Sequence, residues 1–134
     1  PSSRESYPEL HAQVHERLLF ANGNPTQELI ENSEFVVTIN STVGLESLLL
    51  GKPVMTLGQA FFNVPGLVAH ADSVSEMLQL ANSFPQWSLE PVVREGFLRY
   101  LAADYCIQGD WRAADRAQLQ RVAQRMLTLS GYLK

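Results

Sequence analysis

A short polar segment that follows an apolar run contains the residues best suited to binding chemistry. Asn40, Ser41 and Thr42 come directly after the run, and Gly44 and Glu46 lie in the leucine-rich stretch behind them. Small hydroxyl side chains beside the free N–H groups of a helix start suit a phosphate oxygen, because each can donate a hydrogen bond without crowding the anion. The segment therefore allows a phosphate site.

Gly44 and Glu46 extend this hypothesis. A glycine in the first helical turn would let a ligand approach the backbone closely. A glutamate about one turn into the helix could accept hydrogen bonds from ribose hydroxyls, as the acidic residue of dinucleotide sites does. Helix capping is nevertheless the commoner explanation of such a pattern. The chain contains neither a Walker-type glycine-rich loop nor G-x-G-x-x-G, so ATPase and NAD-binding functions have no support.

Three further residues are weaker candidates. Lys52 could reach a phosphate, or its charge could serve the negative end of the preceding helix. Asn22 and Gly23 belong to a loop that could flank a nucleotide base, or they form a plain turn.

The histidines indicate no metal site. His11 and His15 are four residues apart but lack a third ligand, so an exposed helix face is favoured. His70 lies in an apolar loop, where it could approach a ligand or simply face solvent.

The spacing of apolar residues predicts alternating helices and strands. Helices are predicted at 8–18, 26–32, 43–50, 73–83, 90–106 and 113–129, and strands at 19–21, 35–39 and 53–57. Short strands separated by helices are typical of parallel βαβ units. The predicted fold class is α/β: part of a Rossmann-like, doubly wound parallel sheet with a helical C-terminal tail. The chain is taken as one domain, with βα units over 1–72 and mostly helix over 73–134.

Several local features refine this scheme. Thr26 is expected to cap its helix, with Leu29 and Ile30 facing inward. Gly51 is expected at positive φ after a helix end, and Ser73 with Glu76 forms a predicted capping box. The strand at 35–39 is expected to be buried on both faces. The apolar stripe of the last helix is expected to face the core; it comprises Leu119, Val122, Met126 and Leu129.

Composition excludes several classes of function. The 134 residues carry a net charge of -4 without clustered lysine or arginine, which argues against a nucleic-acid or anionic-lipid surface. Cys106 is the single cysteine, so no disulfide framework is expected. No apolar run approaches the roughly 20 residues of a membrane span. The chain begins with Pro1 instead of methionine, and we expect it to be part of a longer protein.

Residues 36–68, VVTINSTVGLESLLLGKPVMTLGQAFFNVPGLV, resemble the capsular polysaccharide biosynthesis proteins that act as Kdo transferases. The segments 97–101 and 109–111 are similar to that family's distal signature. The resemblance implies a glycosyltransferase of the GT-B class, with two Rossmann-like domains and an active site between them. It also implies that this chain is the C-terminal, donor-binding domain.

In that family a His-Pro motif and a Ser/Thr motif bind the CMP phosphate. Asn40, Ser41 and Thr42 match the Ser/Thr motif, and Glu46 matches the position near the ribose. No histidine of this chain precedes a proline, so the His-Pro motif is not intact. The resemblance places the catalytic base in the N-terminal domain, so no catalytic residue, metal or cofactor is expected here and the chain alone should be inactive.

The function implied is transfer of Kdo from CMP-Kdo to a lipid-linked saccharide acceptor that is bound through the other domain. The expected setting is the cytoplasm, peripheral to the inner face of the inner membrane, with other capsule assembly proteins as partners and no nucleic acid. Two alternatives stay open: a UDP-sugar transferase or epimerase-like domain, and a non-catalytic interaction domain of capsule assembly.

Overall fold

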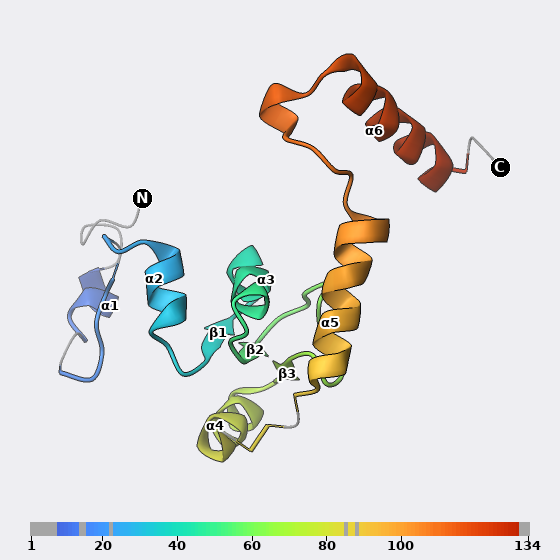
Figure 1. The fold of residues 1–134 in the computed structure, drawn as a ribbon. Helices are drawn as coiled ribbons and strands as arrows, with labels where there is room; N and C mark the ends of the chain where they lie inside the picture. The colour runs from blue at the N-terminus through green and yellow to red at the C-terminus, as the bar shows by residue number, and fades with distance from the viewer. Residues whose placement is uncertain (1–7, 14–15, 22, 85, 88, 132–134) are drawn as a thin grey trace.

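The computed structural model describes residues 8–13, 16–21, 23–84, 86–87 and 89–131, and it places a small sheet among short helices (Figure 1). The helices are α1 (Pro8–His11), α2 (Thr26–Glu31), α3 (Thr42–Leu49), α4 (Val74–Ser83), α5 (Pro91–Tyr100) and α6 (Arg116–Leu129). The strands are β1 (Val36–Thr38), β2 (Val54–Thr56) and β3 (Ala69–His70). A π-helical turn at Leu101–Tyr105 continues α5, and a 3₁₀ turn occupies Trp111–Ala113. The described residues therefore form a mixed α/β structure.

The three strands form one parallel sheet in the order β1-β2-β3. Helix α3 connects β1 to β2, so these elements form the βαβ unit that the sequence predicts. The register pairs Thr38 with Thr56 and Thr56 with His70. These three residues lie side by side where the strands end, and this carboxyl edge is where parallel sheets bind ligands.

The two ends of α3 are fixed by local hydrogen bonds. At its start, Ser41 Oγ accepts from the amide of Val43 at 3.2 Å. At its end, Gly51 adopts a φ of 74° and its amide donates to the carbonyl of Leu48 at 3.2 Å. The amide of Lys52 donates to the carbonyl of Ser47 at 2.9 Å, which completes a Schellman motif. The positive φ predicted for Gly51 is confirmed.

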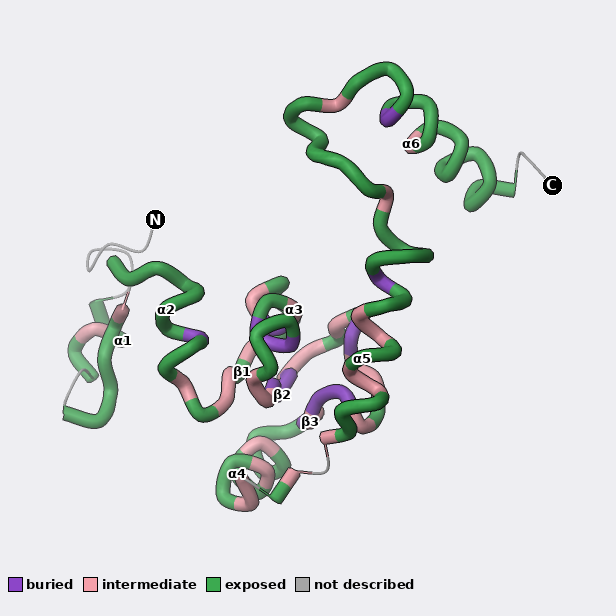
Figure 2. The backbone as a smooth tube through the Cα atoms, in the orientation of Figure 1, coloured by how far each residue is buried: buried purple, intermediate pink, exposed green. Residues whose placement is uncertain are grey.

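A loop takes the place of a second crossover helix and supplies much of the core. The residues between β2 and β3 contain no helix, yet Phe62, Leu67 and Val68 are buried together with Leu48 and Val54. Turns within the loop pair its backbone, for example the Leu67 amide with the Val64 carbonyl at 2.9 Å, as burial requires. Figure 2 shows most of the buried residues gathered along α3, β2 and this loop.

The strand predictions are confirmed in the centre of the chain and wrong at its N-terminal side. Residues 19–21 form no strand, and Leu18 makes only an isolated bridge. The third strand of the sheet, β3, was not predicted. It has only two residues, which are too few to show an alternating apolar pattern. Strand β1 is not buried on both faces, because it lies at the sheet edge and α3 covers one face; Val37 on the other face is 45 % exposed.

The N-terminal helices are shorter than predicted. Helix α1 ends at His11, seven residues before the predicted end, and none of its residues is buried; Leu10 is 49 % exposed. Val14 and His15 lie outside the described residues. In α2 the N-cap is Pro25, Thr26 is the first helical residue, and of the predicted pair Ile30 is buried but Leu29 is exposed.

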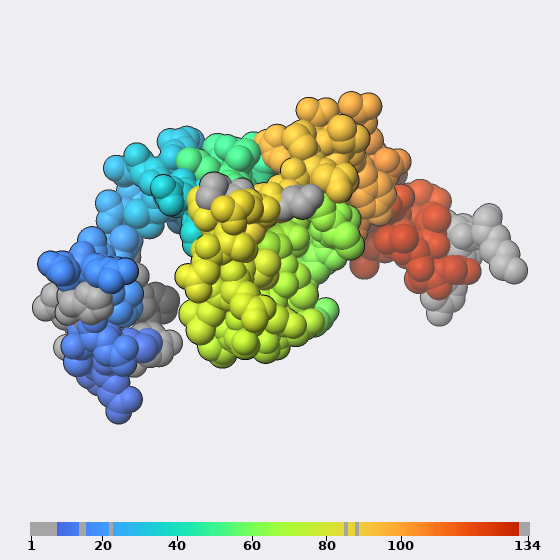
Figure 3. Space-filling model, turned by 90° about the horizontal axis from the view of Figure 1, so that it is seen from below, coloured from blue at the N-terminus to red at the C-terminus, as the bar shows by residue number. Residues whose placement is uncertain are grey.

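The C-terminal helices match the prediction in type but not in packing. Ser73 Oγ accepts from the Glu76 amide at 3.2 Å, and Glu76 Oε2 accepts from the Asp72 amide at 2.8 Å, one residue before the position that a capping box requires. Helix α6 lies away from the sheet (Figures 1 and 3). Its expected core stripe is largely exposed, with Met126 at 65 % and Leu129 at 73 %.

Candidate functional site

The start of α3 lies at the carboxyl end of β1 and is capped by serine. Besides accepting from Val43, Ser41 donates its own amide to Thr38 Oγ1 at 3.1 Å, which ties the helix start to the end of the strand. The first turn of α3 contains no acidic residue. The positive end of the helix dipole is therefore not neutralised within that turn, and this favours an anion.

The four polar residues that the sequence singled out are brought together here. Asn40, Ser41, Thr42 and Glu46 are all exposed. Thr42 and Glu46 are four residues apart in α3, so they lie on the same helix face, one turn from each other. The arrangement offers hydroxyl and amide donors at the helix start and one carboxylate acceptor behind them.

Gly44 has a packing reason to lack a side chain. A Cβ atom there would lie 2.9 Å from Phe62 Cζ and 3.0 Å from Thr38 Cγ2. Those side chains fill the space beside the glycine, and Gly44 itself is buried. Close packing of α3 on the sheet therefore accounts for this residue, and a contact with a ligand stays a prediction.

The weaker candidates do not join the α3 start. Lys52 follows the other end of the helix, and its Nζ donates to the Ser33 carbonyl at 2.9 Å. Gly23 is exposed in a turn, with nothing within 4 Å of a Cβ built on it. Asn22 lies outside the described residues.

A hydrogen-bonded group at the ends of β2 and β3 was missed by the sequence reading. His70 Nδ1 lies 2.9 Å from Thr56 Oγ1 and 3.2 Å from Asn63 Nδ2, while His70 Nε2 lies 3.0 Å from Asp72 Oδ1. Asn63 Nδ2 also donates to the Gly58 carbonyl at 2.9 Å. Because that amide nitrogen must donate, the network assigns the ring proton to Nε2 and leaves Nδ1 as the acceptor.

The sequence offered one signal for this group. The sequence places His70 in a loop, and its position at the end of a strand follows only once β3 is known.

Among the described residues, no group of three or more histidine, cysteine, aspartate or glutamate side chains is placed to hold a metal ion. In the same part of the chain, no helix has both the length and the apolarity to cross a membrane.

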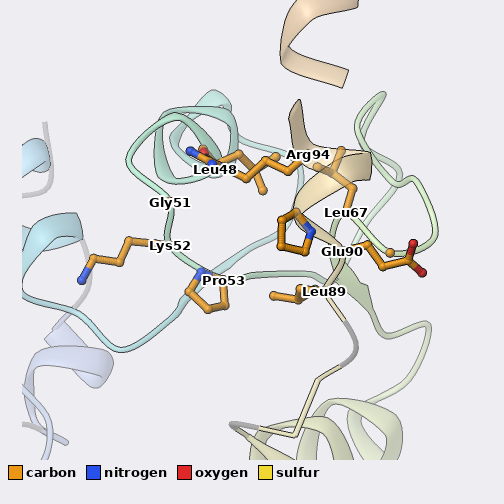
Figure 4. Close-up of a pocket in the computed structure, with 10 residues that line it drawn as sticks. Leu48, Gly51, Lys52, Pro53, Leu67, Leu89, Glu90 and Arg94 are labelled. Carbon is orange, nitrogen blue, oxygen red and sulfur yellow. The ribbon is translucent and has the colours of Figure 1, made fainter. Parts of the chain in front are cut away.

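An apolar pocket of about 250 Å³ lies at the opposite end of α3 (Figure 4). Leu48, Pro53 and Leu67 contribute to its walls. Of the charged residues that line it, Arg94 donates from Nε to the Leu48 carbonyl at 2.6 Å, the Lys52 side chain points away from the pocket, and Glu90 contributes a carboxylate. The pocket lies on the side where β2 begins, so it is not at the edge where parallel sheets bind ligands.

Comparison with known proteins places these features in a family. Residues 4–111 match the family model described as capsule polysaccharide biosynthesis protein. Protein FixF of Sinorhizobium fredii (strain NBRC 101917 / NGR234) is 42% identical over 108 residues, which are 81% of this chain and 27% of FixF. The chain thus spans about a quarter of that relative's length.

Two shorter matches are also to proteins named for capsule polysaccharides. The capsule polysaccharide export protein KpsS of Escherichia coli is 40% identical over 52 residues, 39% of this chain and 13% of KpsS. The capsule polysaccharide modification protein LipB of Neisseria meningitidis serogroup A / serotype 4A (strain DSM 15465 / Z2491) is 33% identical over 57 residues, 42% of this chain and 14% of LipB. No solved structure gives a significant match. The chain belongs to the capsule polysaccharide biosynthesis protein family.

Proposed function

We propose that this chain is the donor-binding part of a GT-B glycosyltransferase that transfers Kdo from CMP-Kdo to a lipid-linked acceptor. The observation that carries the proposal is the start of α3: a serine-capped helix without an acidic first turn, at the carboxyl end of a parallel strand. The family, whose name concerns capsule polysaccharide biosynthesis, supports a saccharide as the substrate class.

In this proposal the phosphate of CMP lies against the hydroxyls of Ser41 and Thr42 and the amide of Thr42. The Ser41 amide donates to Thr38 Oγ1 and so holds this helix start in place, and the donors need not reorganise as negative charge develops on the departing phosphate. Glu46, exposed one turn later, accepts hydrogen bonds from the ribose hydroxyls. The chain's role is to bind and orient the donor.

The proposal places the catalytic base outside this chain, and therefore expects no transfer by the chain alone. It also expects the protein to act at the inner face of the inner membrane, beside other capsule assembly proteins. The names of KpsS and LipB, which concern capsule export and modification, support a place in capsule assembly. The donor itself is assigned here from the resemblance of residues 36–68 to Kdo transferases.

Calorimetric titration with CMP tests the proposal. Glu46→Gln should weaken CMP binding about tenfold, since it removes the charge that strengthens hydrogen bonds to the ribose. Glu95→Gln is the matched control, because Glu95 is also an exposed helical glutamate but lies on α5. Equal affinity of the wild type and Glu46→Gln would contradict the ribose role. Tighter binding of UDP than of CMP would instead favour a UDP-sugar enzyme.

A further inference from the structure

We propose that Asp72, held in place by His70, binds the hydroxyl groups of a sugar unit in the nucleotide-sugar ligand. The inference rests on the proposed function and adds a second contact point at the same edge of the sheet. It is carried by the hydrogen-bonded group of Thr56, Asn63, His70 and Asp72 and by the pocket beside it.

The sheet register sets the spacing between the two contact points. Thr38, Thr56 and His70 are paired neighbours on β1, β2 and β3. With neighbouring strands about 4.8 Å apart, Thr38 and His70 are separated by roughly 10 Å. Since Ser41 is hydrogen-bonded to Thr38, one nucleotide sugar can lie with its phosphate at the start of α3 and a sugar hydroxyl at the end of β3.

The hydrogen bonds lead from the protein interior to the surface. Thr56 is fully buried, the side chain of His70 is 26 % exposed, and that of Asp72 is 75 % exposed. Thr56 and Asn63 fix the Nδ1 side of the imidazole, so the Nε2 proton is directed at Asp72 Oδ1. Oδ2 makes no hydrogen bond within the described part of the chain, and it is the free acceptor for a ligand.

A pocket of about 200 Å³ opens beside this carboxylate. Its lining combines apolar and polar groups and consists of Leu57, Ala71, Asp72, Ser73, Val74 and Met77. Pockets for drug-sized ligands run from about 300 Å³ upward, so this one suits a single ring. A sugar ring has apolar C–H faces and hydroxyl edges, which matches apolar walls with one carboxylate at the rim.

Charge distinguishes this place from the start of α3. The Glu76 carboxylate accepts from the Asp72 amide, so two carboxyl groups lie at the start of α4. A phosphate would be repelled there, whereas hydroxyl donors would be attracted. The start of α3 has no acidic residue in its first turn, so it favours a phosphate over hydroxyl groups. The two helix starts therefore select different parts of one ligand.

Titration of this chain with CMP and with CMP-Kdo tests the inference. Asp72→Asn should raise the dissociation constant of at least one of them about tenfold. Asp104→Asn, a change at another exposed aspartate, is the control and should alter neither. Weaker CMP-Kdo binding with unchanged CMP binding assigns Asp72 to the transferred sugar. Weaker binding of both, with 2′,3′-dideoxy-CMP insensitive to the substitution, assigns it to the ribose.

The outcomes separate this inference from the proposed function. If Asp72→Asn binds both ligands like the wild type while Glu46→Gln weakens CMP, the inference is overturned and the proposed function stands. If the wild type binds neither ligand, both are overturned.

A double-mutant cycle tests the positioning role of His70. His70→Ala should weaken binding of the same ligand as Asp72→Asn, and the double variant should bind no more weakly than Asp72→Asn alone. Fully additive losses would overturn the positioning role, because they would mean that His70 acts independently of Asp72.

Discussion

Gly44 of α3 lies directly against the aromatic ring of Phe62, so that a Cβ atom on Gly44 would approach Phe62 Cζ to 2.9 Å. Phe62 is fully buried in the core cluster and cannot easily move away. We therefore expect Gly44→Ala to lower the free energy of unfolding by about 1–3 kcal/mol through overpacking, despite alanine's better helix propensity. Urea unfolding followed by circular dichroism measures the change.

The chain contains a matched control for this substitution. Gly96 lies within α5, and a Cβ atom built on it has nothing within 4 Å. Gly96→Ala should accordingly stabilise the protein by about 0.5–1 kcal/mol. If both alanine variants were stabilised, the close packing of α3 on Phe62 would be disproved.

The adjacent residues Phe61 and Phe62 should differ widely in their contribution to stability. Phe62 is buried, whereas Phe61 is 56 % exposed and stacks on the exposed ring of Tyr105. Phe62→Ala should cost about 3–5 kcal/mol in the free energy of unfolding, as expected for a large core side chain. Phe61→Ala should cost clearly less, and equal losses in thermal or urea unfolding would show that the loop between β2 and β3 packs differently.

Arg94 connects α5 to the end of α3. Its Nε donates to the Leu48 carbonyl at 2.6 Å, which also accepts from the Gly51 amide, and its Nη2 donates to the Leu49 carbonyl at 3.1 Å, so it caps the last carbonyl groups of α3. Arg94→Met should lower the free energy of unfolding by about 1–2 kcal/mol. Arg99→Met, at an exposed position of the same helix, should change it little. Indistinguishable unfolding curves for the two variants would argue against this cap.

The ring proton of His70 should reside on Nε2 when the imidazole is neutral. Asn63 Nδ2 donates to the Gly58 carbonyl and faces Nδ1 as well, so Nδ1 has to accept. Long-range ¹H–¹⁵N correlation spectra in mildly alkaline buffer report which nitrogen carries the proton. A signal pattern with the proton on Nδ1 would contradict the network and, with it, the orientation given to Asp72.

The centre of the chain could be predicted because its local signals agree with its packing. The run at 53–57 became the fully buried strand β2, and the helix predicted at 43–50 is α3, which begins and ends one residue earlier and is followed by Gly51 at positive φ. The same signals predict a polar segment between β1 and α3; that this segment binds a ligand stays a prediction. Local prediction succeeds here because cap chemistry and the apolar run of β2 act over a few residues.

The remaining features depend on contacts between distant residues, which a pattern does not contain. Strand β3 exists because Met55 and Thr56 pair with Ala69 and His70, although its own sequence has no strand signal. The sequence predicts a loop before His70, but which of its adjacent rings, Phe61 or Phe62, enters the core depends on packing. Conversely, Leu119 and Met126 follow a core pattern but are exposed, because no described element packs on that face of α6.

The proposed donor site is tested most directly by a titration of the ¹⁵N-labelled chain with CMP, followed through the backbone amide shifts. We predict that the largest shifts fall on residues 41–46 at the start of α3, at the carboxyl edge of the sheet. Glu46→Gln should reduce them at equal CMP concentration. Shifts that instead gather around Leu48, Leu67 and Arg94, which line the pocket at the other end of α3, would contradict the proposed donor site.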